Sequence, residues 1–378
     1  MMEPVRNNYI KNAKRIVVKV GSGILTEENG LHLGRIRSIT EQICTLIGKG
    51  YEVLLVSSGA MASGIRKIGL ARRPDELPKR QAVAAVGQAG LILEYEKAFL
   101  RYQKKVAQIL LTSDGLSNRK RYLNARNTLH TLLSWKIIPI INENDTISVE
   151  EIKFGDNDTL AALITLLMDA DLLILLTDID GLFDQNPRTH TQARLIPVVP
   201  KLTKEIESIA GKIPGALGTG GMLSKIEAAK KLTSAGIPMI IANGSKSGIL
   251  IEIMAGKEHG TFFIPKGTRL NSRKSWIAFQ SKPKGTLFID EGAATAIVKR
   301  GKSLLSSGII GLEGDFQEGA PVRFSKDGRI LGSGLVNYNA ADIRKIMGLN
   351  SNQIKERLGY KPYDEVVHRD NLVISPID

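Results

Sequence analysis

Six short apolar runs recur along roughly the first 250 residues, and segments with helical character lie between them. Each run is a nearly continuous apolar block, which is typical of strands buried on both faces of a mainly parallel sheet. The runs are RIVVKV (15–20), YEVLLVSS (51–58), KVAQILLTS (105–113), KIIPIIN (136–142), DLLILLTD (171–178) and IPMIIANG (237–244). This alternation predicts an α/β fold in which a mainly parallel open sheet is sandwiched between helices.

The helical pattern is clearest in two of the intervening segments, and it fades later in the chain. Residues 34–50 and 224–236 carry apolar side chains at i, i+3 and i+4 and end at Gly, a common helix stop. After about residue 265, Pro, Gly and Lys dominate, so we place a domain boundary near residues 275–285. Short strands with Gly turns roughly every 8 to 12 residues then predict a small β-barrel-like domain, followed by a helical SNQIKERLG segment.

The composition excludes several classes of protein. Hydrophobic residues make up 43% and charged residues 24% of the chain, which are ordinary globular values. No apolar run approaches the roughly 20 residues that span a bilayer, so we expect no membrane span. The N-terminal residues show no apolar export signal, and a cytoplasmic location is expected. The lone Cys44 has no partner for an internal disulfide, and the five His residues show no metal-ligand spacing.

The net charge of +14 is distributed unevenly along the chain. Residues 281–378 hold 14 Lys and Arg against 12 Asp and Glu, a balance of +2, so the basic excess lies in the first 280 residues. Because recognition of a nucleic-acid backbone relies on clustered Lys and Arg, this near-neutral segment does not favour RNA binding. An anionic small molecule would need only a few of the cations in the first part.

Polar residues follow several of the apolar runs. In an open parallel sheet ligands bind beyond the carboxyl ends of the strands, so these residues are candidates for function. Lys19 lies near the end of the first run, and Gly21 and Gly23 let the backbone approach an anion closely. A charge inside a buried run needs an anionic partner, whereas a surface lysine before a turn is the alternative. Ser57 and Ser58 precede a helix, where anion binding and simple helix capping explain them equally well.

Carboxylates and amides concentrate in two further segments, NENDTI (142–147) and FGDNDTLAALITLL (154–167). Asp158 precedes an apolar helix and is a candidate N-cap, but a cap needs one carboxylate and these segments supply several. The excess polarity therefore indicates a functional site. The residues concerned are Glu143, Asp145, Asp156 and Asp158, beside Asn142, Asn144 and Asn157.

A glycine-rich segment, GTGGMLSKIEAA (218–229), leads directly into a predicted helix. Gly218, Gly220 and Gly221 precede a first turn that carries Lys225, an arrangement suited to nucleotide phosphates, although a flexible linker is the alternative. The P-loop pattern G-x-x-x-x-G-K-[ST] is absent from the sequence. Lysines, glycine loops and carboxylates together favour phosphoryl transfer to an acidic acceptor.

Six motifs, taken in order, resemble those of the amino acid kinase family. The resemblance covers roughly residues 12–270, and FGDNDTLAA is the most discriminating motif. The motifs are VVKVGSG, VSSGAMASG, NENDTI, FGDNDTLAA, LLTDIDGLF and GTGGMLSKIEAA. The segment from about 284 to 364 resembles a PUA domain. The resemblance thus implies an amino acid kinase catalytic domain (1–275), a PUA domain (284–364) and a C-terminal tail (365–378).

The resemblance also implies an activity. It is ATP-dependent phosphorylation of the γ-carboxylate of L-glutamate, which gives γ-glutamyl phosphate in the first step of proline biosynthesis. Lys19 and Lys225 match the family lysines that contact the transferred phosphoryl group, and Asp158 matches the aspartate that orients them. The positions that match glutamate-binding residues are Ser58, Asp145 and Asn157. The positions that match the ATP site are Lys19, Thr177, Asp178, Thr219, Gly220, Gly221, Met222, Leu223, Ser224 and Lys225.

Cofactors and partners follow from the same resemblance. ATP and Mg²⁺ are expected, and the Mg²⁺ bridges the ATP phosphates without an assigned protein ligand. Family members also tend to be homo-oligomers, here a dimer or tetramer, that proline inhibits. In DQNPR the family more often has Asp before the Pro, and Asn186 stands there in this chain. Two alternatives remain open: a kinase of the same superfamily with another acceptor (acetylglutamate, aspartate or a nucleoside monophosphate), and an RNA-binding protein that uses its PUA domain.

Overall fold

The chain folds into two compact units in the computed structural model. The larger unit comprises residues 1–116 and 120–269, and the smaller one comprises residues 117–119 and 270–378. The structure describes residues 3–27, 30–147, 157–211, 221–267, 269–279 and 281–374.

The larger unit is built on an eight-stranded sheet with the strand order β5-β6-β4-β1-β7-β9-β10-β8. Its strands pair in parallel except β10, which runs antiparallel to β9. All six apolar runs of the sequence form strands of this sheet, so the predicted α/β fold with a mainly parallel sheet is confirmed. The strands are β1 (Arg15–Val20), β4 (Glu52–Ser57), β5 (Val106–Leu111), β6 (Ile138–Glu143), β7 (Leu172–Thr177), β8 (Val198–Val199), β9 (Met239–Asn243) and β10 (Thr261–Phe263).

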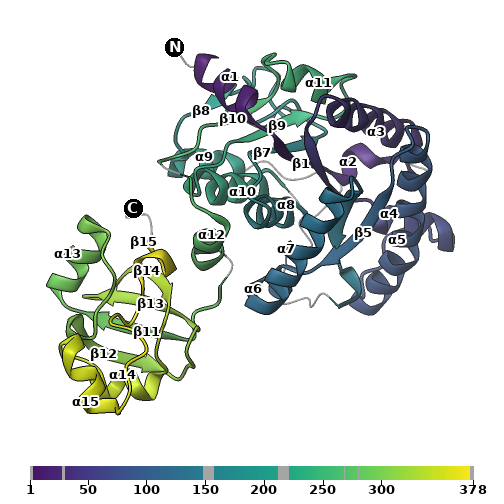
Figure 1. Cartoon of the computed structure of the whole chain (residues 1–378). Coiled ribbons are helices and arrows are strands. Elements are labelled where there is room, and N and C mark those ends of the chain that lie inside the picture. Colours follow the sequence, from purple (N-terminus) through teal and green to yellow (C-terminus); the bar gives the residue numbers. More distant parts are fainter. Residues whose placement is uncertain are drawn as a thin grey trace. The chain divides into compact units, whose positions relative to one another are not determined.

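Helices cover both faces of this sheet (Figure 1). The core on one face takes side chains from α1, α3, α5 and α11, and the opposite face is covered by α8, which α10 contacts in turn. The helices are α1 (Glu3–Asn12), α2 (Ser22–Leu25), α3 (Leu33–Gly48), α4 (Ala60–Ile68), α5 (Leu77–Leu100), α6 (Ser113–Ser117), α7 (Arg119–Ser134), α8 (Asn157–Leu167), α9 (Lys204–Gly211), α10 (Met222–Ser234) and α11 (Ile249–Met254). A short hairpin, β2 (Thr26–Glu27) and β3 (Gly30–Leu31), follows α2.

Strand β1 shows why its lysine reaches a buried site. Successive side chains of a strand point to opposite faces of the sheet. Ile16, Val18 and Val20 belong to the core shared with α3 and α5, so Val17 and Lys19 belong to the other face, where α8 packs on β1. The alternation of the strand therefore places Lys19 toward α8.

Strand β5 differs from the sequence expectation. The run 105–113 is expected to be buried on both faces, but among the described strands β5 lies at the edge of the sheet and pairs with β6 alone. Gln108 and Leu110 are exposed. An apolar run alone does not reveal whether a strand has a neighbour on each side.

Helices α4 and α5 approach each other through glycines. A Cβ atom on Gly64 would lie 1.9 Å from the carbonyl oxygen of Val83, and one on Gly87 would lie 1.8 Å from that of Ala60. The two backbones are thus in direct contact, which leaves no room for a side chain at either position. Helix α4 begins just after the carboxyl end of β4. Its contact with α5 therefore fixes the position of α5, including Gln88, relative to that end of the strand.

The smaller unit contains a five-stranded mixed sheet in the order β12-β11-β13-β14-β15, with its own apolar core that includes Phe324, Tyr338 and Ile343. This confirms a separate small β domain. The segment 291–300, which was expected among short strands, is instead helix α13, because the Asp290 side chain caps it by accepting from the Ala293 N–H at 2.7 Å. The elements are α12 (Ser272–Phe279), β11 (Gly285–Ile289), α13 (Glu291–Arg300), β12 (Ile309–Gly314), β13 (Pro321–Lys326), β14 (Arg329–Leu335), α14 (Ala340–Ile346), α15 (Ile354–Leu358) and β15 (Leu372–Ile374).

No helix among the described residues combines the length and hydropathy that a membrane span requires.

Candidate active site

The centre of the site is a buried carboxylate between two ammonium groups. Asp158, in the first turn of α8, is fully buried and forms ion pairs with Lys19 from β1 and Lys225 from α10. The Lys225 Nζ atom lies 2.9 Å from Asp158 Oδ2, and the Lys19 Nζ atom contacts Oδ1. Both lysines are about 95% buried, since they are 5% and 6% exposed. Residues more than 200 positions apart in the sequence therefore meet at one carboxyl group.

The electrostatics of this triad follow from its burial. Burial by itself raises the pKa of Asp158, but the two ammonium groups and their hydrogen bonds outweigh that effect and hold the pKa well below its usual range. The carboxylate thus stays ionised and supplies the counter-charge for both buried ammonium groups. The three side chains together carry one net positive charge. A buried site with such an excess suits an anion, and a phosphoryl group provides one.

The start of α10 completes this part of the site. Gly221 is the N-cap of the helix, and its carbonyl oxygen accepts from the Ser224 hydroxyl at 2.8 Å. The same hydroxyl lies 3.0 Å from Asp158 Oδ2. Met222 is buried and Leu223 is 46% exposed, so only part of the turn faces the interior. The N-terminus of a helix of this length also contributes a favourable dipole for an anion.

One residue before Asp158, a cluster of amides begins. Asn157 donates through Nδ2 to Ser58 Oγ at 2.9 Å and to Asn142 Oδ1 at 2.8 Å. Asn142, the penultimate residue of β6, donates through Nδ2 to Gln88 Oε1 on α5 at 2.7 Å. Uncharged side chains from the carboxyl ends of β4 and β6, from α5 and from the start of α8 are thus joined by hydrogen bonds. Sequence reasoning singled out Asn157 and Ser58 together, and the structure brings them into contact.

The two serines after β4 do not cap the following helix. The N-cap of α4 is Gly59, with φ of 110°, and no side chain caps the helix there. Ser57 is fully buried, donates to the Ser58 carbonyl at 3.0 Å and lies 2.9 Å from the hydroxyl of Tyr95. The capping alternative therefore does not explain Ser57 and Ser58.

Asp145 opens the 3-10 turn η1 (Asp145–Ile147), which contacts α5. Burial raises the pKa of its carboxyl group, and the nearby charge of Arg73 partly opposes that shift. The carboxylate is therefore costly to keep ionised unless a cation approaches it, which fits a role in binding an amine.

Thr177 ends β7, the neighbour of β1, and Asp178 follows it. The Thr177 hydroxyl donates to Asp178 Oδ1 at 3.1 Å, and Arg188 forms an ion pair with Oδ2. The Asp178 side chain lies against the backbone of Gly23, where a Cβ atom would be 3.4 Å from its Cγ. Polar groups after β1 and β7 thus adjoin at the same edge of the sheet as the lysines.

Asn186, the departure from the family pattern, forms a turn. Its side-chain oxygen accepts from the Arg188 N–H at 3.1 Å, and its carbonyl accepts from the N–H groups of Thr189 and His190. A carboxylate would accept the first bond equally well, so Asn in place of Asp preserves the turn that carries Arg188.

Some expected residues fall outside the described part of the chain. These are Asp156, Gly218, Thr219 and Gly220. Among the residues that are described, no group of three or more His, Cys, Asp or Glu side chains is arranged to hold a metal ion.

Sequence reasoning missed Gln88. It lies inside VAAVGQAGLIL on α5, where apolar and small residues surround it, and it is 8% exposed. The only signal was an amide at a position where the helix is otherwise apolar, and this signal did not reveal which strand end the amide would meet.

Comparison with known proteins agrees with this geometry. Residues 14–243 match the model of the amino acid kinase family, and residues 285–358 match that of the PUA domain. The chain belongs to the amino acid kinase family. It is 50% identical over 374 residues to a glutamate 5-kinase of Syntrophus aciditrophicus, covering 99% of this chain and 97% of that relative. A glutamate 5-kinase of Caldanaerobacter subterraneus is 52% identical over 362 residues, covering 95% and 97%.

We predict that Asp158→Asn destabilises the protein much more than Lys19→Met. The first change leaves two buried ammonium groups without their shared counter-charge, whereas the second leaves the neutral pair of Asp158 and Lys225. Loss of one partner from a buried ion pair typically costs about 3–5 kcal/mol. Urea unfolding, with the midpoint and slope measured for each variant, tests this order. Equal losses in the two variants would contradict the proposed electrostatic balance.

Proposed function

We propose that this chain transfers the γ-phosphoryl group of ATP to the γ-carboxylate of L-glutamate and forms γ-glutamyl phosphate, the first step of proline biosynthesis. The observation that carries the proposal is the pair of buried lysines on Asp158, one residue away from the amide cluster around Asn157. The glutamate 5-kinase relatives, about half identical over nearly the whole chain, support the same reaction.

The reaction needs no general base. A glutamate side chain has a reference pKa of about 4.3, so the acceptor is already a carboxylate at neutral pH. One of its oxygens attacks the γ-phosphorus in line, the bond from that phosphorus to the bridging oxygen breaks, and ADP leaves with that electron pair. Catalysis then consists of aligning two anions that repel each other and neutralising charge on the transferred group. Lys19 and Lys225 supply the positive charge, and Asp158 fixes their ammonium groups.

The two substrates occupy opposite sides of this centre in our proposal. Ser58, Asp145 and Asn157 bind glutamate, and a bound ammonium group would offset the burial that raises the pKa of Asp145. Thr177 and Asp178, together with residues 219–225, bind ATP. The partners of Asp178, Thr177 and Arg188, hold its carboxylate in place beside the strand ends.

We infer that Mg²⁺ enters with the nucleotide. The described residues hold no group of three or more acidic or His side chains suited to a metal, but they include two buried ammonium groups that suit phosphate oxygens. Mg²⁺ bound to the ATP phosphates retains several waters and adds positive charge there. The contribution of the chain is then the lysine pair and the helix N-terminus of α10.

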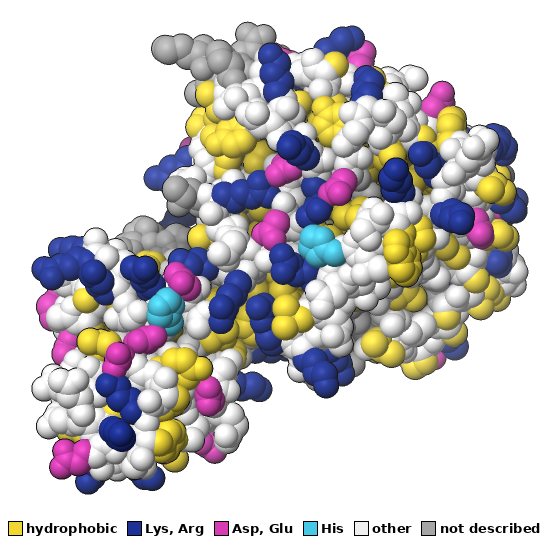
Figure 2. Space-filling model, in the orientation of Figure 1, with side chains coloured by type: hydrophobic (Ala, Val, Ile, Leu, Met, Phe, Trp, Pro, Cys, Tyr) yellow, Lys and Arg dark blue, Asp and Glu magenta, His cyan; other side chains and the backbone are white. Residues whose placement is uncertain are grey.

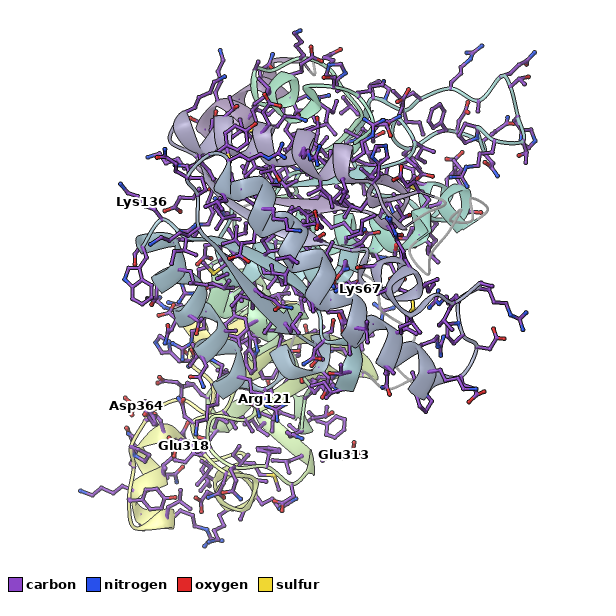
Figure 3. The ribbon with its side chains drawn as sticks, turned by 90° about the vertical axis from the view of Figure 1, so that its right-hand side faces the viewer. Lys67, Arg121, Lys136, Glu313, Glu318 and Asp364 are labelled. Carbon is purple, nitrogen blue, oxygen red and sulfur yellow. The ribbon has the colours of Figure 1, made fainter. Side chains whose placement is uncertain are left out.

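The smaller unit does not favour a nucleic-acid function. On the face that Figure 2 shows, Lys and Arg side chains of this unit are interspersed with Asp and Glu. Figure 3 labels Glu313, Glu318 and Asp364 on this unit, and all three are exposed. Mixed surface charge gives a weak field for a phosphate backbone. We therefore assign the smaller unit no separate activity. Homo-oligomerisation and inhibition by proline remain part of the proposal.

The central experiment traps the product with hydroxylamine. Purified protein with ATP and Mg²⁺ is incubated with glutamate, aspartate and acetylglutamate in parallel, and hydroxamate and ADP are measured. We expect hydroxamate with glutamate and little with the other two acids. A faster reaction with aspartate or acetylglutamate would instead identify a different kinase of the same superfamily.

We predict that Lys19→Ala and Lys225→Ala each lower kcat at least about 100-fold, because each removes a positive charge that is aligned with the transferred group. Each single variant retains the other lysine on Asp158 and should therefore fold. Steady-state ADP release measures kcat, and circular dichroism checks the fold. Near-wild-type turnover in either folded variant would refute the role of that lysine.

We predict that Asp145→Ala raises the KM for glutamate and leaves the KM for ATP nearly unchanged, because it removes a carboxylate on the amino-acid side only. In the unaltered enzyme the glutamate KM should rise as the pH falls through the raised pKa of Asp145, since protonation removes the charge that attracts the ammonium group. Asp145→Asn should abolish this acid-side rise. An unchanged glutamate KM in both variants would rule out the assignment.

A further inference from the structure

A chain of three buried amides crosses from helix α5 to the start of α8. Gln88 is 8% exposed, Asn142 is 3% exposed and Asn157 is 8% exposed. Asn142 Nδ2 donates to Gln88 Oε1 at 2.7 Å, and Asn157 Nδ2 donates to Asn142 Oδ1 at 2.8 Å. In each contact the NH₂ group of one amide donates to the oxygen of the next. The last contact joins Asn157 Nδ2 to Ser58 Oγ at 2.9 Å.

The backbone at one end of the Asn142 amide and Gln88 at the other end together fix the direction of this chain. Asn142 Oδ1 also accepts from the backbone N–H of Glu143 at 2.9 Å, and a backbone N–H is only ever a donor. The oxygen of the Asn142 amide is therefore held toward Glu143 and Asn157, and its NH₂ group is held toward α5. Gln88 must meet that NH₂ group with its oxygen, because two facing donors would leave a buried N–H without an acceptor.

The same direction leaves one acceptor unused. Both N–H bonds of Asn157 are directed to protein acceptors, Asn142 and Ser58. Its other end, Oδ1, is buried and has no hydrogen-bond partner among the residues that the structure describes. A buried amide oxygen of this kind costs free energy until a donor arrives. An ammonium group is a suitable donor, and a carboxylate is not.

We propose that Gln88 is a positioning residue that acts through Asn142 to hold Asn157 Oδ1 toward the substrate, where it accepts from the α-ammonium group of glutamate. This inference rests on the proposed function. It accounts for three neutral side chains aligned in a buried space where apolar packing would otherwise be less costly. The chain of amides thus favours a substrate that carries an amine. If the Asn157 amide were reversed, it would present N–H groups and favour a carboxylate instead.

The test compares two variants of Gln88. Gln88→Met has a similar length and no acceptor, so the NH₂ group of Asn142 loses its partner. Gln88→Glu retains an oxygen acceptor at the same position. The matched control is Gln42→Met: Gln42 is 6% exposed, lies in α3, and accepts from the Leu250 N–H at 2.8 Å, far in sequence from the amide chain. Thermal unfolding is measured for all three proteins.

The readout is a comparison of two ligands that differ only in the amine. For each protein we would measure the KM for glutamate and the inhibition constant of glutarate, which lacks the α-ammonium group, at saturating ATP. Gln88→Met should reduce the preference for glutamate over glutarate about tenfold, the typical effect of losing one hydrogen bond to a charged group. Gln88→Glu and Gln42→Met should keep that preference within about threefold of the wild-type value.

Each contrary outcome has a distinct meaning. If Gln88→Met weakens glutamate and glutarate by the same factor, or if Gln88→Glu loses as much preference as Gln88→Met, the positioning role is wrong. The same conclusion holds if the control variant matches Gln88→Met. Should Gln88→Met fail to fold, Gln88→Ala replaces it as the variant that lacks the acceptor, and the same loss of preference is expected. If wild-type protein yields no hydroxamate from glutamate, the proposed function itself fails.

Discussion

The site depends on one buried carboxylate that two ammonium groups share. Taking Asp158 out of water is costly unless cations compensate, and Lys19 and Lys225 do so from different elements. The ion pairs of Asp158 with the two buried lysines hold β1, α8 and α10 together. The same ion pairs place the two ammonium groups that can bind an anion. The net charge of +1 on the triad leaves the site electrostatically incomplete without an anionic ligand, so the stability of the centre and its affinity for phosphate have a common origin.

Helix α8 joins the two halves of the site through consecutive residues. Asp158 holds the lysines, and Asn157 joins the amides that end at Gln88 and Ser58. Since α8 is almost entirely buried, its first turn moves little relative to the sheet. A transfer between two mutually repelling anions requires both to be aligned at once. In our proposal the two anions are aligned by neighbouring side chains of one rigid turn.

The sequence predicted much of this arrangement. Continuous apolar runs identified the sheet, and a lysine inside such a run identified Lys19, because a buried charge needs a partner. The sequence could not show that β5 is an edge strand, since edge position depends on strand order rather than on the run itself. Helix α13 was missed because the spacing of the Gly residues was interpreted as turns between strands, although Asp290 is a good N-cap. Gln88 was missed because its partner, Asn142, comes from another strand end, and an isolated amide in a helix carries no sign of that contact.

The use of amides on the amino-acid side follows from the charge of the centre. Asn157 is next to Asp158 in the same turn, and a carboxylate in place of its amide would compete with Asp158 for the lysines and cancel the net positive charge that favours the phosphoryl group. Amides direct donors and acceptors without altering that charge. The only carboxylate assigned to glutamate binding, Asp145, lies instead on η1, outside the triad, where burial raises its pKa and the charge of Arg73 opposes that shift only in part. In our proposal the Asn157 amide beside the triad and the Asp145 carboxylate beyond it bind the ammonium group of glutamate. The triad keeps its net positive charge and can bind a phosphoryl group at the same time.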